Sequence, residues 1–150
     1  MIGKTGNLKE PLKFTIPLAP ITKKNSQQII TNPRTKRPMI IQSARYRRYE
    51  KDAGMFLRGK FAEIEDPVNV KATYYMPTKR RVDLTNLHEA LHDVLVHYGI
   101  LIDDNSNIIV STDGSRVKYD KDNPRTEVII TAADDTPCQT MMELEIKDYF

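Results

Sequence analysis

The sequence has a single cysteine, no apolar run of membrane-spanning length and no repeated segment. Cys138 has no second cysteine to pair with, which excludes an internal disulfide and fits a reducing, cytoplasmic location. A helix that crosses a bilayer needs about 20 consecutive apolar residues, and no stretch approaches this, so we expect no membrane partner. The first residues contain no apolar segment of the kind found in secretory signals, so we expect no export signal either.

Positive and negative charges are separated along the chain. Residues 1–81 contain 18 Lys and Arg against 6 Asp and Glu, a net charge of +12. Residues 82–150 contain 5 against 14, a net charge of −9. The basic half favours a phosphate-rich partner, and the acidic half favours cation binding. Ordinary solvated charge on a soluble domain is the alternative interpretation.

Hydrophobic periodicity predicts an α+β fold in a single domain, with a mixed β-sheet packed against two main helices. One helix is predicted to begin after Ser43 and to end at Gly59, and the second to cover residues 84–97. The predicted strands cover residues 13–18, 29–41 (a hairpin with a basic tip), 68–76, 108–112 and 127–131, and residues 100–102 are predicted as a short strand or an extended run.

Proline and polar composition refine this prediction. Pro17 favours a sheet edge for the first strand. Residues 118–124 are predicted to form a polar loop. The chain is 39% hydrophobic, which at 150 residues is enough for one hydrophobic core. We expect residues 1–131 to form that one domain. Residues 132–150 are expected to form an acidic C-terminal appendage.

Residues 80–104, RRVDLTNLHEALHDVLVHYGILIDD, combine basic residues, an amphipathic helix and flanking carboxylates. Asp83 precedes the predicted helix, and Asp103 and Asp104 follow it. Nucleases that hydrolyse phosphodiesters hold Mg²⁺ or Mn²⁺ on a few carboxylates, because these ions prefer hard oxygen ligands. Each aspartate also has a simpler interpretation, since Asp83 could cap the helix and the Asp103-Asp104 pair could form a turn.

The lengths of the two segments limit how these carboxylates can meet. A helix over residues 84–97 is roughly 20 Å long. Residues 99–103, if extended back along it, regain roughly 13–16 Å. Asp103 or Asp104 can therefore approach Asp83 within one chain if the chain reverses at Gly99. If it does not reverse, a site that contains both carboxylates must be shared between subunits.

A second pattern lies inside the helix. The segment from His88 to His92, HEALH, matches the HExxH pattern of zinc peptidases, in which both histidines bind zinc and the glutamate acts as base. The longer form of that pattern is absent, because Leu95 and Tyr98 stand where glycine and a third histidine are expected. A polar helix face that happens to carry two histidines is the favoured interpretation, and a zinc hydrolase is the less favoured one.

Basic residues outside this helix are the candidate DNA contacts. Phosphate contacts from such residues supply affinity without reading sequence. The candidates are Lys23, Lys24, Arg45, Arg47, Arg48, Lys79, Arg80 and Arg81.

The pattern R-R-x-D-L-x-N-L, followed by a helix and then G-x-x-x-D-D, resembles the RusA-like crossover junction endodeoxyribonucleases over roughly residues 13–131. These are small, dimeric, magnesium-dependent Holliday junction resolvases of bacteria and their phages that act in DNA recombination and repair. The resemblance implies an endonuclease that cuts four-way junctions and other branched DNA as a homodimer with Mg²⁺, for which Mn²⁺ can substitute. It also implies that Asp83 and Asp104 are catalytic metal ligands, with Asp103, beside the second of them, as a further catalytic metal ligand.

Two positions depart from the family pattern. The second aspartate of the family's D-L-D-N-L falls at Thr85, and the family's helix lysine falls at Glu89. Thr85 could hold a metal-bound water, Asp103 or Glu89 could supply the missing negative charge, and one of the basic residues at 79–81 could replace the lysine. A catalytically impaired protein that still binds junction DNA is the alternative.

Overall fold

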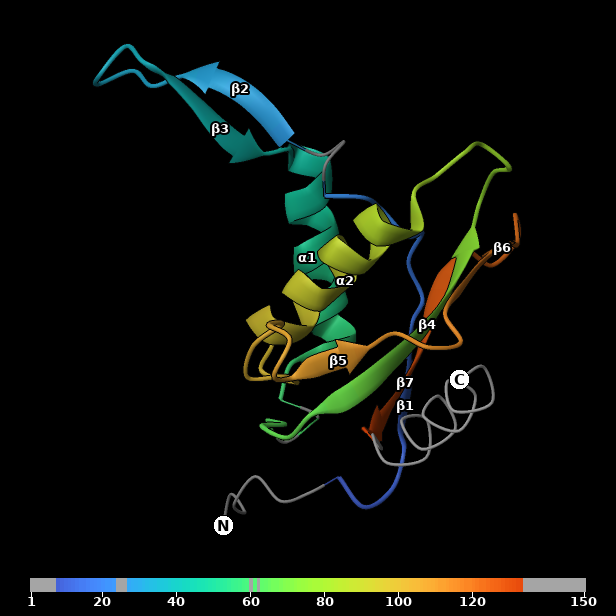
Figure 1. Ribbon diagram of the computed structural model, residues 1–150. Coiled ribbons are helices and arrows are strands. Elements are labelled where there is room, and N and C mark those ends of the chain that lie inside the picture. Colours follow the sequence, from blue (N-terminus) through green and yellow to red (C-terminus); the bar gives the residue numbers. More distant parts are fainter. Residues whose placement is uncertain (1–7, 24–26, 60, 62, 134–150) are drawn as a thin grey trace, which may run out of the picture.

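The computed structural model describes residues 8–23, 27–59, 61 and 63–133 (Figure 1). It has the predicted α+β architecture, with one mixed sheet, two helices and a separate hairpin. In chain order the elements are β1 (Leu12–Ile16), β2 (Gln27–Thr31), β3 (Pro38–Gln42), α1 (Ala44–Leu57), β4 (Val68–Met76), α2 (Leu84–His97), β5 (Ile109–Ser111), β6 (Arg116–Tyr119) and β7 (Arg125–Ala132). The predicted appendage lies beyond the described residues except for Ala132, which belongs to β7, and Ala133, whose backbone N–H donates to the backbone oxygen of Pro67 at 3.0 Å.

The sheet has the order β1-β7-β4-β5, and β6 pairs with β4 as well. The pairs β1–β7 and β7–β4 are antiparallel, whereas β5 and β6 run parallel to β4. Strand β1 ends this order, as Pro17 predicts. The side chain of Asn69, on β4, accepts hydrogen bonds from Ser111 Oγ at the end of β5, at 2.5 Å, and from the Asp113 backbone N–H in the turn before β6, at 2.8 Å. These bonds attach the connecting turn to β4.

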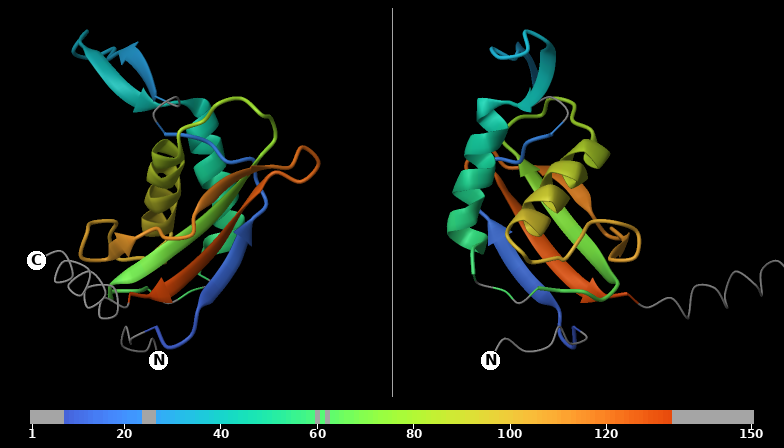
Figure 2. Two further views of the ribbon diagram at one scale, coloured as in Figure 1. Left: turned by 45° about the vertical axis from the view of Figure 1, so that its right-hand side comes forward. Right: turned by 90° about the vertical axis from the view of Figure 1, so that its left-hand side faces the viewer.

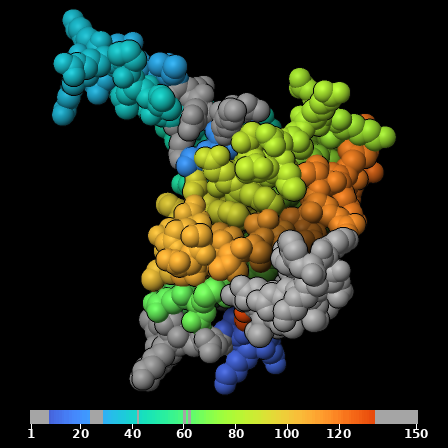
Figure 3. All heavy atoms as spheres, in the orientation of Figure 1, coloured from blue at the N-terminus to red at the C-terminus, as the bar shows by residue number. Residues whose placement is uncertain are grey.

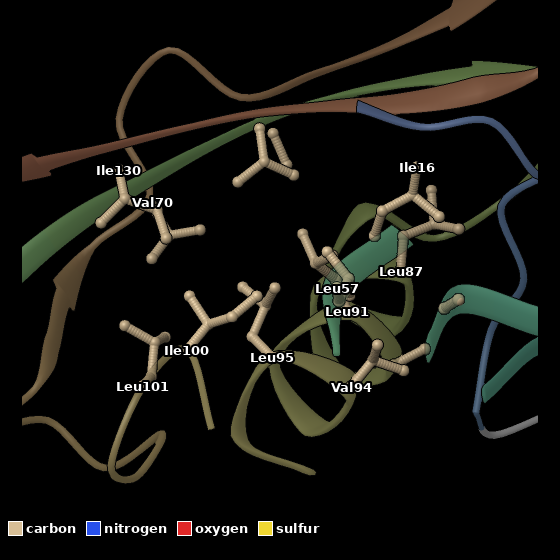
Figure 4. Close-up of a cluster of buried hydrophobic side chains, with 14 of the residues drawn as sticks. Ile16, Leu57, Val70, Leu87, Leu91, Val94, Leu95, Ile100, Leu101 and Ile130 are labelled. Atoms are coloured by element: carbon tan, nitrogen blue, oxygen red, sulfur yellow. The ribbon is translucent and has the colours of Figure 1, made fainter. Parts of the chain in front are cut away.

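Both helices cover the same face of the sheet (Figure 2). Alternate residues of β4 and β7 are buried, as a half-covered strand requires. Figure 4 shows the side chains of Val70 and Ile130 on the face of the sheet that is turned toward α2. They belong to the same core cluster as Leu91 and Leu95 on the apolar stripe of α2. Burial of each such side chain contributes about 1.5–3 kcal/mol relative to exposure, so this one core holds the two layers together.

Local sequence signals set the ends and the crossing of the helices. Helix α1 begins as predicted, because Ser43 Oγ accepts a hydrogen bond from the Tyr46 backbone N–H at 3.2 Å. The two helices approach closely at Gly54, where a Cβ atom would lie 2.5 Å from Tyr98 Oη. Tyr98 Oη in turn donates to the backbone oxygen of Glu50 at 2.5 Å. A side chain at position 54 would therefore displace the Tyr98 ring and disturb this hydrogen bond.

The β2–β3 hairpin stands away from the rest of the domain (Figure 3). Ile29 lies directly opposite Ile40, and Ile30 opposite Met39. Ile29 is 75% exposed and Ile40 is 67% exposed. A two-stranded hairpin is marginally stable in water by itself, so these exposed apolar pairs indicate a surface that something covers.

One predicted detail is wrong in part. Lys118 and Tyr119 belong to β6 and not to a polar loop. All four residues of β6 are exposed, so the strand carries no alternation that could reveal it. Of residues 100–102, predicted as a short strand or an extended run, Leu101 forms an isolated β-bridge with Ile64. Neither described helix, at 14 residues each, is long and apolar enough to cross a membrane.

Candidate active site

Asp83 stands at the N-cap position of α2 without capping it. Its backbone is extended, with φ −93° and ψ 119°, but its carboxylate accepts no capping hydrogen bond from the backbone N–H groups of the first turn of the helix. Among the described residues, the carboxylate accepts one long side-chain hydrogen bond, from Asn86 Nδ2 at 3.5 Å. The exposed carboxylate of Asp83 is therefore available to a ligand, which the simpler capping interpretation does not explain.

A cleft of about 370 Å³, called here the Asp83 cleft, surrounds this carboxylate. It is lined by Thr22, Arg81, Val82, Asp83 and Asn86. Thr85 is exposed in the first turn of α2 but does not line the cleft. Thr85 was predicted to hold a metal-bound water. In the cleft, Thr22 and Asn86 supply the uncharged polar side chains suited to that role, and sequence analysis did not select them.

After α2 the chain reverses at Gly99, which is one of the two possibilities that the sequence left open, with a φ of +73° that favours glycine. The returning segment ends in a tight turn at Asp103. One carboxylate oxygen of Asp103 accepts the Asp104 backbone N–H at 2.7 Å, and the other accepts Asn105 Nδ2 at 2.9 Å. The backbone hydrogen bond is the main cause that lowers the pKa of Asp103. Asp103 thus holds the turn that presents Asp104.

Asp104 faces a second cleft, of about 320 Å³, called here the acidic cleft. Its lining residues are Lys23, Tyr46, Glu50, Asp93, Val96, His97 and Asp104. Partial burial, the hydrogen bond with Asp103 and the negative charge of Asp93 together raise the pKa of Asp104. A carboxylate whose negative charge is disfavoured in this way gains from a nearby cation.

Lys23 supplies such a cation from the loop after β1. Its ammonium forms an ion pair with Asp93, which lies 70 positions later in the chain. The hydrogen bond to Asp93, followed by the charges of Asp93, Glu89 and Asp104, raises the pKa of Lys23. Sequence analysis predicted Lys23 as a DNA contact and did not select Asp93, although Asp93 follows Glu89 by four residues on the polar face of α2.

The two predicted metal ligands do not meet within one chain. Asp104 lies near Asp93, and Asp93 is ten residues beyond Asp83, which is roughly 15 Å along the helix. Among the residues that the structure describes, no three His, Cys, Asp or Glu side chains are grouped to hold a metal ion. The oxygen donors suit Mg²⁺ or Mn²⁺ in chemistry, but one chain presents them in two separate clefts.

The HEALH segment is not arranged as a zinc site. The rings of His88 and His92 are stacked, with centroids 5.5 Å apart and planes 6° apart. Lone pairs of imidazole lie in the ring plane, so two parallel, offset rings do not aim at a common ion. His88 Nδ1 is instead hydrogen-bonded to Tyr74 Oη at 2.7 Å. Burial lowers the pKa of both histidines, that of His92 to about 4.

The predicted DNA contacts fall into separate groups. Arg45, Arg80 and Arg81 converge on a third cleft, of about 390 Å³, called here the basic cleft. Arg47 and Arg48 are exposed on α1. The Lys79 ammonium lies over the ring of Tyr119, with its Nζ 5.2 Å from the ring centroid. The prediction for Lys24 falls outside the described residues.

Comparison with known proteins agrees with the sequence resemblance. The family model described as Endodeoxyribonuclease RusA matches residues 17–131, which include all three clefts and both helices. No curated protein matches the chain. The matched range is 115 of the 150 residues. The chain therefore belongs to the RusA family of endodeoxyribonucleases.

Proposed function

We propose that this chain is a divalent-metal-dependent endonuclease that resolves four-way junctions and related branched DNA as a homodimer. Family membership supports the nuclease class and branched DNA as the substrate. The observation that most supports a metal site is the uncapped carboxylate of Asp83. An aspartate at this position can contribute about 1 kcal/mol by capping the helix. The side chain forgoes that bond and stays exposed, which favours a role as a ligand.

Asp83 and Asp104 are the proposed ligands of Mg²⁺, for which Mn²⁺ substitutes, and Asp103 holds the turn beside them. Because the two ligands occupy separate clefts in one chain, we propose that Asp83 of one copy and Asp104 of a second copy form each site. Both residues are exposed, as this requires. A two-fold axis then repeats the site, one for each of the two strands that resolution must cut. The bound metal supplies charge neutralisation at the scissile phosphate and activation of the attacking water.

The remaining polar residues have supporting roles in this proposal. Thr85, exposed in the first turn of α2, stays the proposed holder of a metal-bound water in the assembled site, although its side chain does not line the Asp83 cleft of one chain. Lys23, fixed by Asp93, supplies the positive charge that the family places at the position of Glu89. The ammonium steadies the phosphate and offsets the repulsion among the carboxylates of the acidic cleft.

The β2–β3 hairpin is the proposed contact between the two copies. Each strand of the hairpin pairs only with the other among the described residues, so both outer edges are open to a further strand. Its most exposed pair, Ile29 and Ile40, offers apolar surface beside those edges. A second hairpin of the same sequence covers the apolar side chains and pairs one open edge, which a single copy leaves exposed.

The proposal includes a cytoplasmic location and a role in DNA recombination and repair, in a bacterium or a phage. Cys138 would stay reduced there.

A labelled four-way junction, incubated with and without Mg²⁺ or Mn²⁺, tests the proposal. The protein should cut the junction only when metal is present and should leave a linear duplex of the same sequence intact. Asp83→Asn keeps the size of the side chain and removes its charge, so it should bind the junction as well as the parent or better and cut nothing. Cutting at the parental rate would show that Asp83 is not a ligand. Binding without cutting by the parent would favour the impaired DNA-binding alternative.

A further inference from the structure

We infer that the basic cleft binds one unstacked nucleotide of the substrate strand, next to the phosphate that is cut. The inference rests on the proposed function and adds a place for a base, which neither the family match nor the carboxylates assign. The cleft is lined by the loop after β1, the first turn of α1, the end of β4 and the segment between β4 and α2.

The charge of this cleft favours a phosphate. Arg45 comes from α1, and Arg80 and Arg81 come from the segment before α2. No carboxylate lines the cleft, and none of the three arginines forms an ion pair with another described residue. One guanidinium group can donate two parallel hydrogen bonds to the oxygens of a phosphate. Three such groups on one cleft therefore form a strong site for the phosphates on either side of a nucleotide.

The rest of the lining favours a base over a bare phosphate. Five apolar residues form it together with Thr22 and Thr78, and a free phosphate gains nothing from them. They are Pro20, Ile21, Met76, Pro77 and Val82. An unstacked base offers an apolar face to such a floor, and guanidinium planes also stack on bases. The volume of about 390 Å³ lies at the lower end of the range of about 300–1,000 Å³ that small-molecule sites span, so it fits one nucleotide.

The position of the cleft connects it to the proposed reaction. Thr22, Arg81 and Val82 line the basic cleft and the Asp83 cleft alike, so the two are adjoining parts of one groove. A strand whose scissile phosphate lies at Asp83 therefore places a neighbouring nucleotide among the arginines. A base inside a duplex is stacked on both faces and cannot enter, whereas bases at a branch point cost less to unstack. The cleft thus provides a physical reason for preferring branched over linear DNA.

The test uses four-way junctions with 2-aminopurine, a fluorescent base quenched by stacking, at the nucleotide beside the cut. The full-length Asp83→Asn protein binds without cutting, so emission reports the bound state alone. Emission should rise on binding, and it should not rise when the label lies several nucleotides along the same arm. Arg45→Ala should weaken junction binding roughly tenfold, as for a hydrogen bond to a charged group. Lys51→Ala, which removes one exposed positive charge from the same helix outside the cleft, should have a much smaller effect.

A second variant separates the base from the phosphate. Met76→Gln makes the floor polar at similar length and should reduce the emission rise, while Arg45 still holds the phosphate. Replacing the labelled nucleotide by an abasic one should weaken binding to the Asp83→Asn protein and change little for the same protein carrying Met76→Gln. Tight junction binding with silent 2-aminopurine would overturn the nucleotide site and leave the proposed function intact. Failure to prefer a junction over a duplex would overturn both.

Discussion

Mixing two inactive variants tests whether the catalytic site is shared between subunits. Asp83→Asn and Asp104→Asn should each be inactive alone, because every site in either homodimer lacks one ligand. In a heterodimer, Asp83 comes from the Asp104→Asn chain and Asp104 from the Asp83→Asn chain, so one of the two sites is intact. The other site lacks both ligands. A site built within one chain would never be restored by mixing.

The expected magnitude follows from the two-fold arrangement. Random association of equal amounts gives heterodimers in about half of the dimers, and each has one intact site of two, so about one quarter of all sites are active. Purified heterodimer, selected with two different affinity tags, should show about half the parental number of active sites. With one active site per dimer, the enzyme should nick one strand of a labelled junction and not resolve it. Denaturing gels count the nicks, and native gels show the absence of resolved duplexes.

The refuting result is defined by the same samples. Heterodimer that binds the junction and produces no nicks would exclude a shared site, and so would a parent protein that cuts as a monomer. In that case Asp104 would act within the acidic cleft, with Asp93 as its neighbour, and Asp83 would belong to a different function.

Three further predictions concern the dimer, the metal and the core. Ile29→Glu with Ile40→Glu should convert the dimer to a monomer in light scattering and abolish cleavage, whereas Met55→Glu, at an isolated apolar residue that is 76% exposed, should leave the dimer intact. Thr85→Asp restores the family's usual carboxylate and should lower the Mg²⁺ concentration for half-maximal cleavage; a higher requirement would contradict the role given to this position. His92 has a pKa of about 4 in the folded protein, below its ordinary 6.5, so the unfolded chain binds more protons between these values. Stability is therefore fully present above about pH 6.5 and falls by roughly 3 kcal/mol as the pH drops to 4. Urea unfolding should show this slope and show it flattened in His92→Gln; equal slopes would refute the assignment.

Two of the periodic segments were predictable to the residue. Strand β4 and helix α2 have the bounds that their apolar spacing predicts, because each buries one regular face against the same core. Strand β6 was missed since it lies outside the regular order of the sheet with every residue exposed, so its sequence carries no record of pairing. A strand that forms through backbone pairing with its neighbour, without burying side chains, shows no hydrophobic alternation in its sequence.

The candidate site was predictable in its carboxylates and not in its arrangement. Spacing identified Asp83 and Asp104, but the sequence could not show whether the Asp83 carboxylate folds back on its helix. It also could not show how far the chain returns after Gly99. That return brings Asp104 beside Asp93 and leaves Asp83 a further stretch of helix away. Convergence of Arg45 with Arg80 depends on tertiary folding, since 35 positions separate them in the chain.

The charge at the position of Glu89 illustrates why residue-by-residue comparison with the family is incomplete. A glutamate in place of the family's helix lysine removes one positive charge and adds a negative one. Lys23, from a loop more than sixty positions earlier, lies within electrostatic reach of Glu89 and pairs with Asp93. In the proposed function, the positive charge is therefore retained in space while its place in the sequence differs. Removing Lys23 alone should then harm the site as loss of the helix lysine would, and Lys23→Met with Glu89→Lys should restore cleavage that Lys23→Met loses. Cleavage rates of the single and double variants on one junction check this, and an inactive double variant that still folds and binds would show that Lys23 acts only in its own position.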